Sequence, residues 1–501
     1  MNAHYDILII GAGLSGIGTA RRLASECPEK SLAILERRER IGGTWDLFRY
    51  PGVRSDSDML SFGYEGRLWT QSNVLADASS LRRYIEETAR EAGITERIRF
   101  GVKVLAADWS SAERRWKLNV VCEATGDKEE YTCSFLIACT GYYNHEAGFK
   151  PEFPGEKQFS GALFHAQSWP EGLDYSGKKV VVIGSGATAV TVVPAMADTT
   201  AHITLLQRSP TYYFLLPALD HFTARLARIA PTRWAYGLAR WRNIKIQRTF
   251  YLACRRWPAL MRRLLLSQVR KHIGPDIDMR HFTPKYMPWD ERLCVVPDAD
   301  LLKAVRTGKA SIETDEIETF TPHGLRLKAG KEIEADIVVV ATGLNMQMLG
   351  GLALSVDGLP HSLGDRVTYK SVLVEGIPNF AWMFGYINQP WTLKMDAAAS
   401  YLCRLFKFMR SKRLEVVTAR DLNANALKEG ILDGLQSGYV RRGGHVWPRQ
   451  GKDYPWKVAM YYPSDKKMLL QDPIEDSFLR FVSTREPCPT KVGARPSVQS
   501  A

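Results

Sequence analysis

Two glycine-rich segments restrict the folds that this 501-residue chain can adopt. The first, residues 11–16 (GAGLSG), follows the apolar run 5–10 and precedes residues 17–24, which have the pattern of a helix. In a strand, tight turn and helix of this kind, free backbone N–H groups and the helix dipole face a pyrophosphate. The segment therefore predicts a βαβ unit that binds a dinucleotide.

An acidic residue stands where it can distinguish between dinucleotides. The second predicted strand, 31–35, is followed by Glu36, twenty residues after Gly16. A carboxylate at this place accepts a hydrogen bond from a ribose 2′-hydroxyl. We therefore expect the first unit to bind an unphosphorylated ribose, as in FAD or NAD.

The second glycine-rich segment is residues 184–189 (GSGATA), which follow the predicted strand 179–183. Nineteen residues further on, the strand 203–207 is followed by Arg208 and Ser209. A cation and a hydroxyl suit a 2′-phosphate, so NADPH is expected over NADH. One GxGxxG is a weak signal, and Arg208 could be an ordinary charge at a strand end. Two complete units, each with its own discriminating residue, predict two nucleotide cofactors on one chain.

Composition fits a large soluble enzyme of two or three domains, with 45% hydrophobic residues. The eight cysteines have neither CxxC nor metal-ligand spacing, so we expect reduced thiols and no metal site. No basic leader or cleavable apolar segment precedes the first strand, which predicts a cytoplasmic protein. The uncharged run 180–197 belongs to the second nucleotide unit and is not expected to span a membrane.

The residues after the first predicted βαβ unit limit which electron acceptor the protein could use. Flavoproteins of the disulfide reductase type carry a cysteine pair there, whereas this chain has Gly42, Gly43, Thr44 and Trp45. Because no dithiol relay is available, electrons that pass from NADPH to a flavin are expected to reach another acceptor. Molecular oxygen is the leading candidate.

Two further motifs resemble those of the class B flavoprotein monooxygenases of the Baeyer–Villiger type. Residues 42–56 fit the pattern [AG]GxWxxxx[FY]P[GM]xxxD, and residues 159–170 fit FxGxxxHxxxWP. Heteroatom-oxidising relatives usually lack the final proline of the second motif. Within the family, the similarity is greatest to the flavin monooxygenases that activate ethionamide or are associated with long-chain alkane growth. The defining positions of the second motif are Phe159, Gly161, His165, Trp169 and Pro170.

The resemblance implies an α/β fold with two Rossmann-like domains, one for FAD and one for NADP. The FAD domain is expected to be discontinuous, at residues 1–150 and 345–501. The NADP domain is expected at residues 151–210 and 276–344. Residues 211–275 are expected to form a basic helical insertion.

By the same resemblance, Arg292 corresponds to the active-site arginine and Asp56 to the carboxylate that pairs with it. A guanidinium keeps its proton at working pH, so it can stabilise an anionic intermediate and then an oxyanion. An ordinary ion pair between domains is the alternative. His165 is expected to organise the structure during turnover, with simple packing as the alternative. Many relatives have a cofactor-binding lysine where this chain has Glu291, which leaves more of the NADPH selectivity to Arg208.

Gly141 and Gly343 end predicted strands where such folds bring the chain close to a cofactor, although each could be an ordinary turn glycine. The residues expected to contact the cofactors are Gly11, Gly13, Ser15, Gly16, Glu36, Gly43, Thr44, Trp45, Asp56, Val104, Gly141, Gly184, Gly186, Ala187, Thr188, Ala189, Arg208, Ser209 and Gly343.

The implied reaction begins with hydride transfer from NADPH to FAD. A C4a-peroxyflavin then forms with O2 in a site shielded from water and attacks a ketone, giving an ester or lactone. Small apolar ketones are the expected substrates, with thioether sulfoxidation as a side activity. Two alternatives remain: an oxygenase for sulfur or nitrogen only, and a membrane-peripheral flavoprotein that merely leaks electrons to oxygen.

The net charge of +13 arises in one segment. Residues 221–275 hold thirteen lysines and arginines and no acid, while the other 54 bases are matched by 54 acids. Aromatic residues and leucines interleave with these bases, as in helices that lie on anionic membranes. The favoured interpretation is a solvated basic face whose apolar underside packs on the enzyme. Nucleic acid is not an expected partner, because no recognition fold accompanies the charge. A homo-oligomer stays open.

Overall fold

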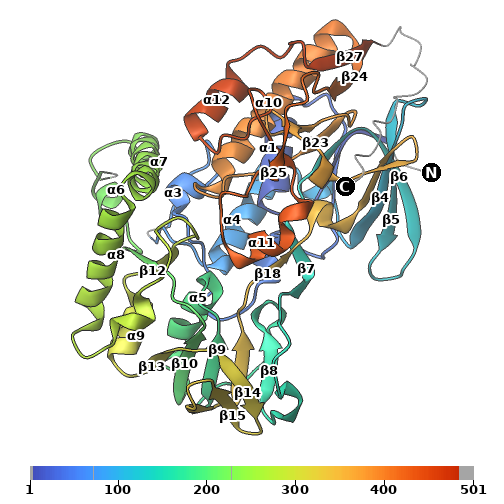
Figure 1. The fold of residues 1–501 in the computed structure, drawn as a ribbon. Coiled ribbons are helices and arrows are strands. Elements are labelled where there is room, and N and C mark those ends of the chain that lie inside the picture. Colours follow the sequence, from blue (N-terminus) through green and yellow to red (C-terminus); the bar gives the residue numbers. More distant parts are fainter. Residues whose placement is uncertain (1–3, 72, 227, 484–501) are drawn as a thin grey trace.

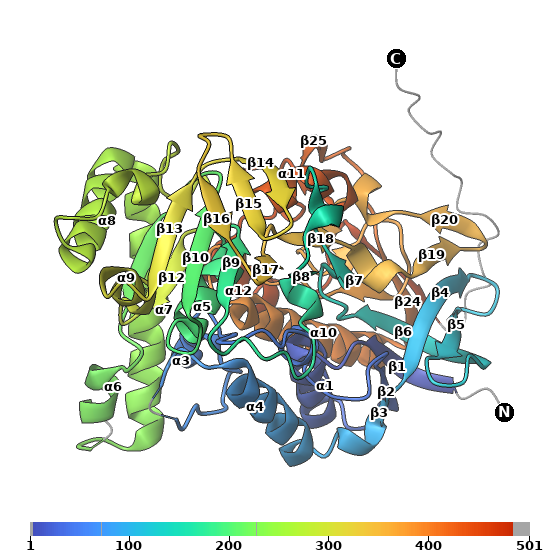
Figure 2. The same cartoon turned by 90° about the horizontal axis from the view of Figure 1, so that it is seen from below.

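Two large sheets organise the chain in the computed structural model, which describes residues 4–71, 73–226 and 228–483 (Figures 1 and 2). Each sheet is centred on a strand that leads into one of the glycine-rich segments. Together with the matching helices, these sheets confirm the expected α/β fold with two Rossmann-like units.

The first sheet contains eleven strands, in the order β20-β19-β4-β5-β6-β1-β2-β3, with β23, β22 and β21 joined to it through β6. Strand β1 runs parallel to both β2 and β6, so the first glycine turn leaves the middle of a parallel array. The strands are β1 (His4–Ile10), β2 (Leu32–Leu35), β3 (Ile98–Arg99), β4 (Val102–Ser110), β5 (Arg115–Cys122), β6 (Lys128–Ala138), β19 (Ala353–Val356), β20 (Leu359–His361), β21 (Thr368–Tyr369), β22 (Leu373–Val374) and β23 (Phe380–Trp382).

The second sheet is wholly parallel, in the order β13-β10-β9-β17-β8. Strand β9 lies between β10 and β17 and leads into the second glycine turn, so its position corresponds to that of β1 in the first sheet. The strands are β8 (Ala162–His165), β9 (Lys179–Ile183), β10 (His202–Gln207), β13 (Ala310–Thr314) and β17 (Ile337–Val340).

Both central strands become fully apolar toward the glycine turns, at residues 7–10 of β1 and 180–183 of β9, because both of their faces are buried there. Ile7 and Ile9 of β1 belong to one hydrophobic cluster, while Leu8 and Ile10 belong to another on the opposite face of the sheet. Since successive side chains of a strand point to opposite faces, a strand covered on both sides reads as a continuous apolar run. Strand β9 divides its side chains between two clusters in the same way.

The chain passes between the sheets twice, and the two passages pair with each other. Strand β7 (Tyr143–Gly148) leads from the first sheet toward the second, and β18 (Leu344–Met346) leads back. They form an antiparallel pair in which Leu344 is opposite Gly148. The remaining small sheets are formed by β11 (Tyr213–Leu216) with β12 (Cys294–Pro297); by β14 (Ile317–Thr321), β15 (Gly324–Leu327) and β16 (Glu332–Glu334); by β24 (Leu414–Ala419) with β27 (Leu479–Ser483); and by β25 (Ala426–Gly430) with β26 (Arg449–Gly451).

The helices cover the sheets and extend one edge of the molecule. Helix α10 packs against α1 and α12, while α9 packs against α5 and α8. The helices are α1 (Leu14–Glu26), α2 (Thr44–Leu47), α3 (Met59–Phe62), α4 (Ala78–Glu91), α5 (Ala187–Met196), α6 (His221–Leu226), α7 (Thr232–Arg256), α8 (Pro258–Ile273), α9 (Asp300–Arg306), α10 (Trp391–Lys412), α11 (Gly438–Gly443) and α12 (Tyr462–Leu470).

The basic segment 211–275 begins with a strand and continues as helices. Strand β11 pairs in parallel with β12, and its Tyr213 is buried in the core of the second sheet opposite Cys294. Helices α6, α7 and α8 follow and stand at the left edge of the molecule in both views (Figures 1 and 2).

Within the described part of the chain, no helix combines the length and the apolar character that crossing a bilayer requires. The uncharged run 180–197 forms β9, the second glycine turn and α5. The described cysteines are free thiols, and Cys488 lies outside the described residues. In the same residues, no group of three or more His, Cys, Asp or Glu side chains could hold a metal ion.

Candidate active site

A cavity of about 380 Å³ joins the first glycine turn to the segment that carries Arg292. Ala187 and Thr188 of the second glycine-rich segment also line it, so both nucleotide units contribute to one space. The predicted site residues along its wall are Gly11, Gly13, Ser15, Glu36, Gly43, Thr44, Trp45, Asp56, Val104, Gly141, Ala187, Thr188 and Arg292.

Two glycines of the first glycine turn, Gly11 and Gly16, have no room for a side chain. Gly11 has φ +99°, and a Cβ there would lie 2.7 Å from the carbonyl oxygen of Cys139. A Cβ on Gly16 would lie 1.8 Å from the carbonyl oxygen of Gly11. Helix α1 starts without a capping side chain, which leaves its first N–H groups to a phosphate. The turn is therefore built as a pyrophosphate cradle.

The Glu36 carboxylate is held at the cavity wall by the backbone. It accepts hydrogen bonds from the N–H groups of Ala12 at 2.7 Å and Arg38 at 2.9 Å. Burial raises the pKa of Glu36, and the two N–H donors act against that shift. Each oxygen keeps a further acceptor site, which suits a ribose hydroxyl. The residues present thus fit an unphosphorylated ribose next to the pyrophosphate cradle.

Arg292 and Asp56 meet in the cavity although they are far apart in the sequence. One guanidinium nitrogen of Arg292, Nη2, lies 3.3 Å from Oδ2 of Asp56. About a third of the Arg292 side chain is exposed, and it lines the cavity. Burial acts to lower the pKa of Arg292, but Asp56 and the neighbouring tyrosines outweigh burial and raise it. The guanidinium therefore remains a fixed positive charge at this wall.

Asp290 anchors the loop that carries Arg292. Its Oδ2 accepts a hydrogen bond from the N–H of Met287 at 3.0 Å, and its Oδ1 lies 3.1 Å from Nη1 of Arg255 in α7. Its carbonyl oxygen accepts a hydrogen bond from the N–H of Gln436 at 2.9 Å. Two distant parts of the chain, α7 and residue 436, therefore hold the loop that carries Arg292.

The second glycine turn has open space beside one of its glycines, Gly186. Gly184 has φ +142°, and a Cβ there would lie 2.3 Å from the carbonyl oxygen of Ala341. A Cβ on Gly186 would meet nothing within 4 Å, so the protein itself does not require this glycine. Helix α5 also starts without a capping side chain, and Ala189 is fully buried within it. The open side of Gly186 is suited to close approach by a ligand.

Arg208 and Ser209 are exposed at the end of β10, outside the cavity wall. Within the described residues, Arg208 forms no hydrogen bond or ion pair, which leaves its guanidinium for a ligand. Burial raises the pKa of Glu291, and the positive charges of Arg441 and Arg208 oppose that shift. Glu291 therefore lies within electrostatic reach of both arginines.

The motif at 42–56 connects the two nucleotide units. The side chain of Tyr50 hydrogen-bonds to that of Thr188 in α5. Gly52 has φ +75°, and a Cβ there would lie 2.6 Å from the Cβ of Ala195 and 2.9 Å from the carbonyl oxygen of Thr191. The motif thus packs directly against the helix that follows the second glycine turn.

His165 lies at the two passages between the sheets. Its Nε2 donates to the carbonyl oxygen of Gly343 at 3.0 Å, and its Nδ1 accepts from the N–H of Gln167 at 3.1 Å. A Cβ on Gly148 would lie 1.9 Å from the imidazole ring. Burial lowers the pKa of His165, although the bond to Gly343 opposes this. A neutral imidazole with both nitrogens engaged holds the passages together.

The other residues of this second motif pack against the sheet. Trp169 meets Phe164 edge to face at 5.2 Å, and Phe159 meets Phe320 in the same way. A Cβ on Gly161 would lie 2.3 Å from the carbonyl oxygen of Asp336. Pro170 is half-buried. Of the described residues that line the 380 Å³ cavity, none comes from this motif.

An aromatic wall formed by Tyr142 and by Trp391 of α10 borders the cavity, and it was not expected from the sequence. Trp391 donates a hydrogen bond to the hydroxyl of Ser15 at 2.8 Å and stacks on Tyr142. Burial raises the pKa of Tyr142 to about 12, so its phenol is neutral. Gln389 also lines the cavity, and its buried Oε1 has no hydrogen-bond partner within the described residues. No local pattern marks these residues.

Asp46 is a second contributor that motif analysis missed. Its carboxylate is almost fully buried and forms ion pairs with four arginines, which fix the turn carrying Gly43 and Trp45. A run of arginines on either side of this aspartate was the available signal. The four are Arg38, Arg40, Arg49 and Arg82.

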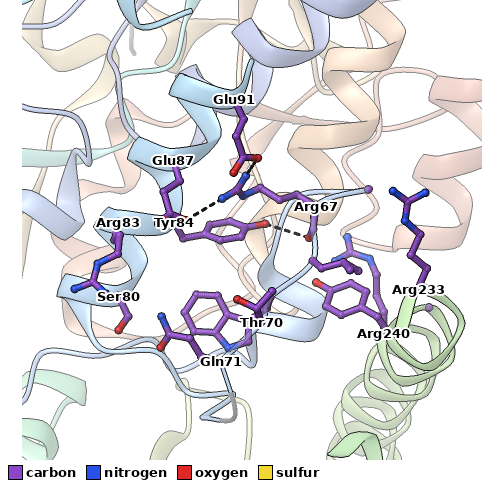
Figure 3. Close-up of a pocket in the computed structure, with 15 residues that line it drawn as sticks. Arg67, Thr70, Gln71, Ser80, Arg83, Tyr84, Glu87, Glu91, Arg233 and Arg240 are labelled. Carbon is purple, nitrogen blue, oxygen red and sulfur yellow. Dashed lines mark hydrogen bonds and ion pairs between the residues drawn. The ribbon is translucent and has the colours of Figure 1, made fainter. Parts of the chain in front are cut away.

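A larger groove of about 910 Å³ lies elsewhere, between α4, residues 66–71 and α7 (Figure 3). Arg67 crosses it to pair with Glu87 at 3.1 Å and also with Glu91. Arg233 and Arg240 reach it from α7 (Figure 3). Among the described residues that line the groove, none belongs to either glycine-rich segment, so it is distinct from the candidate active site.

Comparisons with known proteins agree with this geometry. The profile of the flavin-binding monooxygenase-like family matches residues 70–217, and that of the NAD(P)-binding Rossmann-like domain matches residues 9–78. The chain is similar in fold to a steroid monooxygenase bound to NADP, with a TM-score of 0.70, 20% identity and coverage of 83% of this chain and 88% of that one. It is equally similar to an open form of cyclohexanone monooxygenase, with a TM-score of 0.71, 19% identity and coverage of 83% and 90%.

Sequence similarity to curated proteins extends along nearly the entire chain. The FAD-containing monooxygenase EthA of Mycobacterium tuberculosis is 44% identical over 494 residues, which cover 98% of this chain and 100% of EthA. The FAD-containing monooxygenase MymA of the same species is 58% identical over 490 residues, which cover 97% of this chain and 99% of MymA. The chain therefore belongs to the FAD-containing, flavin-binding monooxygenases.

Proposed function

We propose that this protein uses NADPH and O2 to insert one oxygen atom next to a ketone carbonyl. A ketone, O2, NADPH and a proton would give an ester or lactone, water and NADP+, with sulfoxidation of thioethers as a side activity. The observation that supports this proposal is the Arg292 guanidinium, held beside Asp56 in the cavity to which both nucleotide units contribute.

The cofactor assignment follows from the two turns. FAD is proposed for the first unit, where Glu36 would accept a hydrogen bond from a ribose hydroxyl and the uncapped start of α1 would face the pyrophosphate. NADPH is proposed for the second unit, with Arg208 and Ser209 at the 2′-phosphate. The corresponding domain boundaries are proposed at 1–150 with 345–501 for FAD, and at 151–210 with 276–344 for NADPH.

Within the cavity, the protein would provide a fixed positive charge and a surface that excludes water. When bound, the flavin accepts the hydride and activates oxygen. Arg292 would stabilise the negative charge that develops on the substrate oxygen, because a guanidinium does not lose its proton at working pH. Asp56 would position Arg292. The aromatic wall of Tyr142 and Trp391 would exclude water, which otherwise diverts reduced oxygen to hydrogen peroxide.

The test compares the wild type with Arg292→Ala, using 2-octanone and a thioether as separate substrates. We expect the wild type to give ester coupled to NADPH oxidation and Arg292→Ala to lose about 100- to 1000-fold in kcat/KM for the ketone, as when an oxyanion-stabilising donor is removed. Arg280→Ala, an exposed arginine paired with Asp278, is the matched control and should behave as wild type. FAD content, measured by absorbance, should be equal in all three proteins.

Two results would contradict the proposal. Oxidation of the thioether alone would assign the protein to heteroatom oxygenation. NADPH oxidation that yields only hydrogen peroxide with both substrates would assign it to an oxidase-like leak.

A further inference from the structure

Helices α7 and α8 present large apolar side chains to solvent. Eleven of the eighteen exposed large apolar residues of the described chain lie between residues 219 and 264. They include Trp234, which is 78% exposed, and Trp241 and Trp257, which are 54% and 57% exposed. So many outward-facing tryptophans on one pair of helices are unusual for a surface that meets only water.

The exposed residues of α7 form one stripe along the helix. Trp234, Leu238, Trp241, Lys245 and Leu252 follow each other at steps of three, four or seven residues, which places them on one face. The opposite face buries mainly small residues such as Ala235 and Ala239. The sequence favours an apolar underside packed on the enzyme, but the structure turns the tryptophans of this segment outward.

The position of α7 is fixed by polar contacts, so the exposed stripe is a stable surface. One nitrogen of Arg240, Nη1, donates to the carbonyl oxygens of Leu60, Ser61 and Gly63 at 2.9 to 3.1 Å. The hydroxyl of Tyr236 donates to the carbonyl oxygen of Met59 at 3.3 Å. These contacts hold one side of the helix against the protein and leave the stripe on the other.

The same segment carries positive charge that the protein does not neutralise. Of the thirteen lysines and arginines between residues 221 and 275, two form ion pairs within the described residues: Arg242 with Asp220 and Arg255 with Asp290. Lys245 stands over the Trp241 ring, with its Nζ 4.3 Å from the ring centroid. The surface therefore combines apolar rings with unpaired cations.

We propose that this surface, the exposed side of α7 and α8, binds the surface of an anionic lipid bilayer. Tryptophan and leucine side chains insert at the boundary between headgroups and acyl chains, while lysine and arginine attract anionic headgroups. A second copy of the chain is a poor match, because a symmetric dimer would bring the same uncompensated positive charge onto itself. The proposal is independent of the reaction that the enzyme catalyses.

Sedimentation of the full-length, FAD-loaded enzyme with vesicles tests this proposal. We expect binding to vesicles of equal parts phosphatidylglycerol and phosphatidylcholine, release at high salt, and no binding to phosphatidylcholine alone. The double variant Trp234→Ser/Trp241→Ser should bind about tenfold more weakly, as should Lys245→Gln/Arg256→Gln. The matched control is Leu359→Ser, at an exposed leucine outside this surface, and it should bind as wild type.

Flavin absorbance and NADPH oxidation in the absence of lipid should be the same in all variants, which shows that they fold. The proposal is overturned if the wild type does not sediment with anionic vesicles, or if the tryptophan variant binds equally well. Self-association in sedimentation velocity that the tryptophan substitutions abolish would assign the surface to a second copy instead.

Discussion

Glu291 places a carboxyl group directly beside the proposed active-site arginine. It precedes Arg292 directly and lies near Arg208 and Arg441, both of which oppose the rise in its pKa caused by burial. A carboxylate at this place would repel the 2′-phosphate that we propose to bind near Arg208. The cofactor's 2′-phosphate therefore has two candidate cations on this surface.

Substitutions at these positions should separate NADPH from NADH. We expect Glu291→Lys to lower the KM for NADPH several-fold, because a repelling charge becomes an attracting one. Arg208→Gln should raise that KM about tenfold, which corresponds to about 1.4 kcal/mol. Steady-state kinetics with both cofactors is the measurement. An equal change with NADH would contradict the assignment, because NADH has no 2′-phosphate.

The paired passages β7 and β18 and the motif at 42–56 determine how the two nucleotide units face each other. His165 links both passages, by a hydrogen bond to Gly343 and by contact with Gly148. Gly52 presses the 42–56 motif against α5 at a distance that excludes any side chain. Gly52 and His165 do not line the cavity, yet their contacts influence its shape.

Replacing Gly52 should weaken the packing of the 42–56 motif on α5 without weakening FAD binding. Gly52→Ala would place a Cβ 2.6 Å from Ala195 at φ +75°, where L residues are also strained. We expect a lower melting temperature, a destabilisation of about 1–3 kcal/mol and a raised KM for NADPH with FAD content unchanged. Gly93→Ala, at φ +63° with no atom within 4 Å of the added Cβ, separates backbone strain from steric contact. Equal effects of both substitutions would rule out the docking contact.

Helix α10 ties the first nucleotide unit to the rest of the molecule through buried polar groups. Asp396 accepts a hydrogen bond from the N–H of Glu65 at 2.7 Å, and burial raises its pKa to about 6. Arg240 of α7 and Arg22 of α1 act to lower that pKa. Elements from three parts of the chain therefore converge on this carboxyl group.

Stability should depend on pH through Asp396. Because the folded pKa is above the unfolded value of 3.8, this group favours folding when protonated. Its contribution is fully present below about pH 4 and is lost as pH rises through about 6. Asp396→Asn should therefore gain stability relative to wild type between pH 4 and pH 7, by at most about 3 kcal/mol. Urea unfolding of both proteins across this range measures the difference, and a constant difference would refute the expectation.

The features that the sequence predicted correctly depend on residues close to one another in the chain. An apolar strand, a glycine turn and a helix follow one another directly in the sequence of each nucleotide unit. The residue that selects the ribose lies at the end of the next strand. Both nucleotide units and the family were therefore predictable from short segments. The motif at 42–56 was also recognisable, although its contact with α5 was not.

Packing between segments that are distant in the sequence determined the remaining features of the site and of the surface. Asp56 and Arg292 are separated by 236 positions, and their pairing depends on a loop held by α7 and by residue 436. Trp391 reaches Ser15 across 376 positions, and no pattern in either segment indicates this contact. The amphipathic pattern of α7 gave its helical period but not which face meets the protein, because small buried residues can secure a helix as well as large ones. Local sequence sets backbone conformation, whereas contacts between distant segments depend on how complete elements pack together.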